Sequence, residues 1–221
     1  MSRWEIRIAT VIAAMALGLT PTATTAAEQP GLAIAALETL PVKGRAPKTG
    51  YTRDQFGQAW ADVDRNGCDT RNDILKRDLT SLTYKAKIRN CVVLSGTLLD
   101  RYSGESINFV RGNITSMEVQ IDHVVALSNA WQTGAFKLTA EQRKALANDP
   151  INLFAVKGRL NSQKGDGDAA TWLPPLKSFR CAYVAQQIAV KAKYSLWVVP
   201  PEKAAMLSIL AKCPTQKLPV S

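Results

Sequence analysis

The apolar residues of this chain recur with the spacings of both strands and helices. Runs rich in β-branched and other apolar residues, separated by turn-forming residues, predict strands over residues 91–100, 106–112 and 117–125. The first two runs are joined by a turn around Ser103 and Gly104, which predicts a hairpin.

Helical patterns are clearest in the second half of the chain. Thr139 and Gln142 have the spacing of a capping box, and the helix that they begin ends before Pro150. Two further helices are expected over residues 178–192 and 201–211. The second has proline in its first turn, where the missing N–H would have had no helical partner.

The start of the chain has the organisation of a secretory signal peptide. Two arginines precede an apolar run over residues 8–19, and Thr25 and Ala27 are small residues at cleavage spacing. The run is shorter than the roughly 20 residues needed to cross a bilayer, so an uncleaved membrane anchor is the weaker alternative. We expect residues 1–27 to be removed. The mature protein is then secreted or associated with the cell surface, without stable membrane insertion.

Residues 28–50 predict a flexible N-terminal arm, whose one apolar patch is compatible with a short docked helix. The globular pattern begins at Tyr51, and Tyr51, Phe56 and Trp60 have roughly helical spacing. We expect one domain over residues 51–221, which is long enough to bury a core.

All four cysteines follow the leader. Export favours their oxidation, so we expect two disulfides rather than a metal site. Four cysteines allow three pairings, and order along the chain favours Cys68 with Cys91 and Cys181 with Cys213, since each pair closes a short loop.

A formal net charge of +10 makes a polyanionic partner plausible. Many exported proteins are basic for solubility or for contact with an anionic cell wall, so charge alone does not identify nucleic acid.

The single histidine, His123, follows Asp122 at the end of the predicted strand 117–125. A lone histidine is more often structural than catalytic. However, a phosphodiester hydrolase needs a base that works near neutral pH and a cation that neutralises the phosphoryl oxygens. Imidazole suits the first task. An aspartate with one neutral oxygen donor can hold Mg²⁺, because this ion keeps several waters.

Two segments, IDHVVALSNAW and DPINLFAVKGRLNSQKGD, resemble the HNH (ββα-metal) endonuclease motif in the form whose last histidine is replaced by asparagine. They are most similar to the HNH domain at the C-terminus of modification-dependent (GmrSD-like) restriction enzymes, and to small secreted bacterial proteins that carry this domain alone. The resemblance covers about residues 116–176, and a weaker likeness extends upstream towards Tyr51.

The resemblance implies a role for each matching residue. Asp122 and Asn161 would be the metal ligands, His123 the general base, and Asn152 the residue that holds the loop carrying the base. The expected cation is Mg²⁺, with Mn²⁺ as an alternative, and its binding should be weak and exchangeable because only one ligand is a carboxylate.

The expected fold is therefore α+β: a small ββα-metal core embedded in a mostly helical, disulfide-linked single domain. The core would consist of strands near 117–124 and 151–156 and a short helix near 157–164.

Four cations could bind substrate: Arg71, Arg111, Lys157 and Lys164. Arg71 could grip a phosphate with two hydrogen bonds, or form a salt bridge with Asp73 at a helix start. Solvated surface charge is the alternative for the others. Function is thus predicted as a secreted endonuclease that acts on nucleic acid, with DNA favoured over RNA and little sequence specificity.

Two alternatives belong to other classes. One is a basic secreted module that binds nucleic acid or cell-wall polymer through a degenerate nuclease site. The other is a different hydrolase, in which His123 activates Ser128 or a cysteine. Oxidised cysteines and the absence of a nucleophile-elbow pattern weigh against the second alternative.

Overall fold

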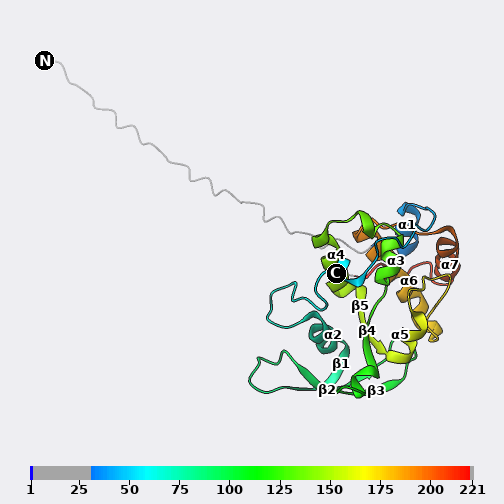
Figure 1. The fold of residues 1–221 in the computed structure, drawn as a ribbon. Coiled ribbons are helices and arrows are strands. Elements are labelled where there is room, and N and C mark those ends of the chain that lie inside the picture. Colours follow the sequence, from blue (N-terminus) through cyan, green and yellow to red (C-terminus); the bar gives the residue numbers. More distant parts are fainter. Residues whose placement is uncertain (2–30, 220–221) are drawn as a thin grey trace.

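The computed structural model describes Met1 and residues 31–219 and shows an α+β domain (Figure 1). Its helices are α1 (Ala33–Thr39), α2 (Thr70–Asp78), α3 (Leu127–Gln132), α4 (Ala140–Asn148), α5 (Gly158–Lys164), α6 (Arg180–Lys193) and α7 (Pro200–Leu210). Its strands are β1 (Leu79–Tyr84), β2 (Val93–Leu99), β3 (Ser106–Val110), β4 (Val119–His123) and β5 (Leu153–Lys157). The α+β class is confirmed. The expectation of a mostly helical domain was wrong, because helices account for fewer than half of the described residues.

The strands form two antiparallel sheets. One has the order β1-β2-β3, and the other pairs β4 with β5 in a register that places Asp122 opposite Phe154 and His123 opposite Leu153. Helix α5 follows β5 directly and contacts both strands of this pair. In Figure 1 the β4–β5 pair lies at the centre of the domain, with β1–β3 towards one edge and α6 and α7 on the other side.

The β4–β5 pair is buried on both faces. Leu153 and Ala155 belong to an apolar cluster with α2 and the three-stranded sheet. Phe154 and Val156 belong to a second cluster, with α1, α6 and α7. This explains why β5 is a continuous apolar run rather than an alternating one, since each of its side chains meets a covered face.

Several predicted elements occur close to their expected bounds. Thr139 and Gln142 form the capping box that begins α4. The aromatic spacing from Tyr51 to Trp60 does not produce a helix: only one 3-10 turn, η1 (Arg53–Phe56), forms there. Phe56 packs towards Trp131 in a third apolar cluster, so its burial explains the pattern without a helix.

In the segment after the leader, the apolar patch that we considered compatible with a short docked helix forms α1. Ala33 and Leu37 of α1 are fully buried, and α1 contacts α6 and α7. Apolar burial thus makes α1 part of the packed domain, whereas residues 41–50 lie mostly exposed on its surface. The predicted signal peptide, residues 1–27, lies almost entirely outside the described residues. Among the described helices, none has the length and apolar character needed to span a bilayer.

The disulfides join Cys68 to Cys91 and Cys181 to Cys213, as the order of the cysteines favoured. The second links the first turn of α6 to the segment just after α7. A buried ion pair joins the other ends of these two helices: Lys191 donates to Glu202 over 2.9 Å, and Glu202 also accepts from the N–H of Val199 at the start of α7.

Lys191→Met should lower the free energy of unfolding by about 3–5 kcal/mol, because it leaves the buried Glu202 carboxylate without its cation. The double variant Lys191→Met/Glu202→Leu should recover most of this loss. Urea denaturation measures both, with the exposed Lys212→Met as a control that should match wild type. A single variant as stable as this control would contradict a buried ion pair.

Candidate active site

Asp122, His123 and Asn161 line one small cavity of about 100 Å³, although Asn161 is far from the other two in sequence. Strand β4 ends at His123. The antiparallel pairing with β5 places the start of α5 beside the start of β4, and α5 then runs along β4, so that Asn161 contacts Gln120 and Lys164 contacts Asp122. The remaining lining residues are Arg53, Ile121, Ala126, Leu127 and Gly165. The two predicted metal ligands and the predicted base therefore face a common space.

The imidazole of His123 has a fixed orientation. Its Nε2 lies 2.8 Å from the carbonyl oxygen of Ala147. A carbonyl can only accept a hydrogen bond, so Nε2 carries the proton and Nδ1 keeps a free lone pair. The ring also stacks on Trp60, with centroids 5.9 Å apart and planes 15° apart.

Burial lowers the pKa of His123 to about 4. The hydrogen bond with Ala147 acts in the opposite direction, and the charges of Arg53 and Lys164 add to the lowering. At neutral pH the ring is thus uncharged and Nδ1 is unprotonated, while the lowered pKa makes it a weaker base than a free imidazole.

Asp122 is almost completely buried, and both of its carboxylate oxygens accept hydrogen bonds. Lys164 donates to Oδ1 over 2.9 Å and Tyr102 donates to Oδ2 over 2.5 Å. Burial raises the pKa of Asp122, while Lys164 and Tyr102 oppose this rise. The Lys164 ammonium also donates to the backbone oxygen of His123, over 2.8 Å. The buried Lys164 ammonium therefore holds both the Asp122 carboxylate and the backbone of His123 in position.

Asn152 holds the backbone that follows His123. Its Oδ1 accepts from the N–H of Val125, and its backbone oxygen accepts from the N–H of Val124, both over 2.8 Å. Its Nδ2 donates to the carbonyl oxygens of Val125 and Leu146 over 3.4 and 3.3 Å. Asn152 has no exposed surface, so it acts on the site through the loop alone.

Asn161 contacts the neighbouring strand through one end of its amide only. Its Nδ2 donates to Gln120 over 2.8 Å, while its Oδ1 has no hydrogen-bond partner among residues 31–219. Within the same described part there is no group of three or more His, Cys, Asp or Glu side chains that could hold a metal.

The donor set fits a weakly held divalent cation of the Mg²⁺ type. Asp122 and Asn161 offer hard oxygen donors to one cavity, and Mg²⁺ needs few protein ligands because it retains waters. The hydrogen bonds to Asp122 do not exhaust its capacity, since each carboxylate oxygen has two lone pairs.

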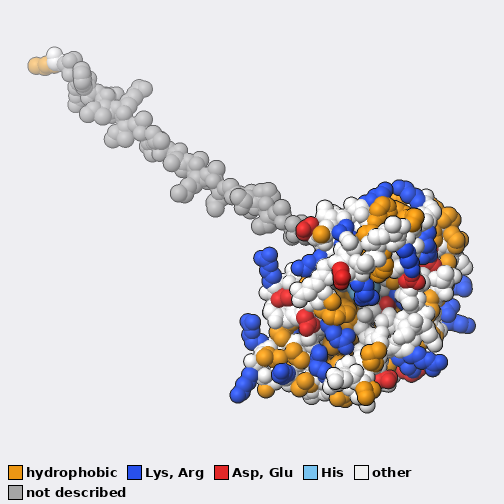
Figure 2. Space-filling model, viewed as in Figure 1, with side chains coloured by type: hydrophobic (Ala, Val, Ile, Leu, Met, Phe, Trp, Pro, Cys, Tyr) orange, Lys and Arg blue, Asp and Glu red, His pale blue; other side chains and the backbone are white. Residues whose placement is uncertain are grey.

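The four predicted substrate-binding cations do not line this cavity. Each has a partner within the protein: Arg71 with the backbone oxygen of Val119, Arg111 with Asn72 and the backbone oxygen of Val93, Lys157 with Glu105, and Lys164 with Asp122. Lys164 has no exposed side-chain surface, so it lies under the site rather than at its mouth. Lys and Arg side chains are spread over the face shown in Figure 2 rather than gathered in one patch.

Two residues at the site were missed by the sequence reasoning, Arg53 and Trp60. Both precede His123 by more than 60 positions, and only the aromatic spacing around Phe56 marked their segment. Trp60 has a φ of 55°, a left-handed conformation that a tryptophan rarely adopts and that costs about 1–3 kcal/mol. Its stacking on His123 and the hydrogen bond from the N–H of Thr70 to its backbone oxygen hold it in this conformation.

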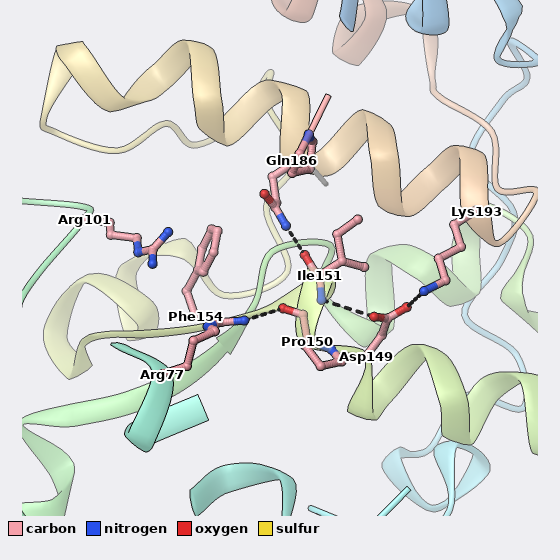
Figure 3. A pocket seen from close by; sticks show the side chains of 9 residues that line it. Arg77, Arg101, Asp149, Pro150, Ile151, Phe154, Gln186 and Lys193 are labelled. Atoms are coloured by element: carbon pink, nitrogen blue, oxygen red, sulfur yellow. Dashed lines mark hydrogen bonds and ion pairs between the residues drawn. The ribbon is translucent and has the colours of Figure 1, made fainter. Parts of the chain in front are cut away.

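A larger hollow of about 530 Å³ lies elsewhere on the domain, between the start of β5 and α6 (Figure 3). Its cations are paired: Arg77 and Arg101 with Asp78, and Lys193 with Asp149. None of the residues that line the His123 cavity borders it. The hollow is therefore a less convincing candidate for chemistry, despite its size.

Comparisons with known proteins give one family and one relative. The family model described as "GmrSD restriction endonucleases, C-terminal domain" matches residues 69–209. An "Uncharacterized secreted protein" of Arthroderma benhamiae is 38% identical over 179 residues, which are 80% of this chain and 82% of that protein. No solved structure matches the chain. Asp122, His123, Asn152 and Asn161 all lie within the family match, whereas Arg53 and Trp60 precede it.

Asn152→Ala should lower the free energy of unfolding by about 2–3 kcal/mol, because the buried N–H of Val125 loses its acceptor. Urea denaturation tests this, and the exposed Asn113→Ala is the matched control. Equal stability of the two variants would show that Asn152 does not hold the loop.

Proposed function

The chain belongs to the family of the GmrSD restriction endonuclease C-terminal domain, and from this premise we propose that it is a secreted, metal-dependent endonuclease that hydrolyses phosphodiester bonds. The observation that carries the proposal is the cavity in which His123, with a free Nδ1, faces Asp122 and Asn161. We interpret β4, β5 and α5 as a ββα-metal unit, since β4 supplies Asp122 and His123, α5 supplies Asn161, and β5 pairs with β4 and leads directly into α5.

In this proposal His123 acts as the general base. Its Nδ1 takes a proton from water, whose oxygen attacks phosphorus in line with the 3′-oxygen. As the new bond from oxygen to phosphorus forms, the bond from phosphorus to the 3′-oxygen breaks. The leaving oxygen keeps the electron pair and takes a proton from solvent, which gives 5′-phosphate ends. The Nε2 contact with Ala147 keeps the base in the required tautomer.

The other residues prepare this step. Asp122 and Asn161 would hold Mg²⁺, which when bound supplies positive charge next to the phosphoryl and leaving oxygens. Lys164 and Tyr102 keep the Asp122 carboxylate oriented, and Asn152 keeps the backbone after His123 in place. Trp60 limits rotation of the imidazole by stacking on it.

Nucleic acid is the substrate class that the family implies. DNA is the substrate we propose, with little sequence specificity, and the net charge of +10 suits attraction to any phosphate backbone. The proposed export rests on the N-terminal pattern and on the secreted relative. A binding module with a degenerate site is the competing proposal, and such a module would bind DNA without cutting it.

Purified mature protein should cut plasmid DNA with Mg²⁺ and should stop on chelation. His123→Ala should lower the rate by about 10²–10⁴, because no base remains for the attacking water. Ser128→Ala should cut like wild type, since Ser128 is not the nucleophile in this mechanism. Cutting that survives chelation, or equal rates for wild type and His123→Ala, would refute the mechanism. Binding without any cutting would identify a binding module.

Asn161→Ala should raise the Mg²⁺ concentration for half-maximal cutting by about tenfold or more, because one of two protein ligands is lost. Asn161→Asp should lower it, because a second carboxylate attracts the cation more strongly. Titration of Mg²⁺ in the cleavage assay measures the shift, with Ser162→Ala on the same helix as the control. A half-maximal concentration unaffected by either Asn161 variant would exclude Asn161 as a ligand.

A further inference from the structure

Among residues 31–219, Arg53 is the only Lys or Arg that lines the His123 cavity, and its side chain has no partner there. It is exposed, and its guanidinium forms no ion pair or hydrogen bond with any residue between 31 and 219. A free cation that lines the same cavity as Asp122, His123 and Asn161 is suited to an anionic ligand.

The other candidate cations lack this freedom. Arg71 and Arg111 donate to oxygens inside the protein, and Lys157 is paired with Glu105. Lys164 is fully buried against Asp122. Using any of them for substrate would break an existing contact, whereas Arg53 can bind an anion at no such cost.

The backbone of Arg53 is well supported although its side chain is free. Arg53 begins η1, whose last residue, Phe56, is buried beside Tyr51 and Trp131. Arg143 of α4 donates to the backbone oxygen of Gln55 over 2.6 Å and to the Gln55 side chain over 3.2 Å. The position from which the guanidinium extends is thus set by the fold before any ligand arrives, which reduces the entropy lost on binding.

We propose that Arg53 binds the non-bridging oxygens of the phosphodiester that is cut, and so determines where the phosphate lies relative to His123 and Asp122. The inference rests on the proposed nuclease function and deepens it. A guanidinium is planar and can offer two parallel N–H groups to two phosphate oxygens, which a lysine cannot do. The contact should strengthen as negative charge builds up during the attack.

This assignment adds a residue from outside the span matched by the family, residues 69–209. The segment from Tyr51 to Trp60 would then contribute twice to the site, through Arg53 towards the phosphate and through Trp60 towards the base. A domain trimmed to the matched span would lack both contributions.

The first test compares Arg53→Ala, Arg53→Lys and the exposed Lys212→Ala, which removes one positive charge far along the chain. Arg53→Ala should lower kcat on plasmid DNA by about 10²–10³ with a smaller change in KM, because the contact is strongest in the transition state. Arg53→Lys should lie between wild type and Arg53→Ala. Thermal unfolding should be the same for all, since Arg53 is exposed. If Arg53→Ala and Lys212→Ala have equal kcat, the proposal is wrong.

A binding measurement separates this inference from the nuclease function itself. In a His123→Ala background with chelator, fluorescence anisotropy with a short DNA duplex should show weaker binding on Arg53→Ala, and the slope of log affinity against log salt should fall by about 1. If the wild type never cuts but this slope changes, the phosphate contact stands and the nuclease function fails. If Arg53→Ala binds like the Lys212→Ala control, the phosphate contact fails whether or not the protein cuts DNA.

Discussion

The buried carboxylate of Asp122 is the constraint around which the domain is arranged. A buried charge is costly unless it is paired and hydrogen-bonded. Its two partners come from different parts of the chain: Lys164 from the end of α5, and Tyr102 from the turn between β2 and β3. Satisfying one carboxylate therefore ties the helix, the three-stranded sheet and the end of β4 together. The same Lys164 ammonium also donates to the backbone oxygen of His123. The pairing of the Asp122 charge therefore orients His123 as well.

This arrangement separates a rigid floor from an adaptable mouth. The floor consists of Lys164 and Asn152, whose polar groups are occupied by other parts of the chain, and of Asp122, whose carboxylate is held by Lys164 and Tyr102 but keeps lone pairs for a cation. The mouth contains groups with free capacity: Nδ1 of His123, the side-chain oxygen of Asn161 and the guanidinium of Arg53. A catalytic site needs fixed geometry, so we expect it to combine side chains held in place by the fold with side chains that are free to bind substrate.

Local patterns in the sequence predicted β4 and the capping box that begins α4, because each is encoded within a few residues. Strand β5 and helix α5 were expected only from the resemblance to the HNH motif. Strand β1 was not predicted, because LTSLTY has no continuous apolar run and its pairing with β2 makes it a strand. Arg53 could not be assigned for a similar reason: its place at the site depends on packing between η1 and α4, distant in sequence.

The burial of β5 on both faces has a consequence for folding fidelity. A slip of one residue against β4 would exchange the environments of Leu153 and Phe154 and bury the wrong set on each side. The same slip would shift Asn152 and Asn161 relative to His123. Correct packing of β5 and correct spacing of the site residues therefore depend on the same register. The pairing of β4 with β5 thus links the packing of the core to the geometry of the site.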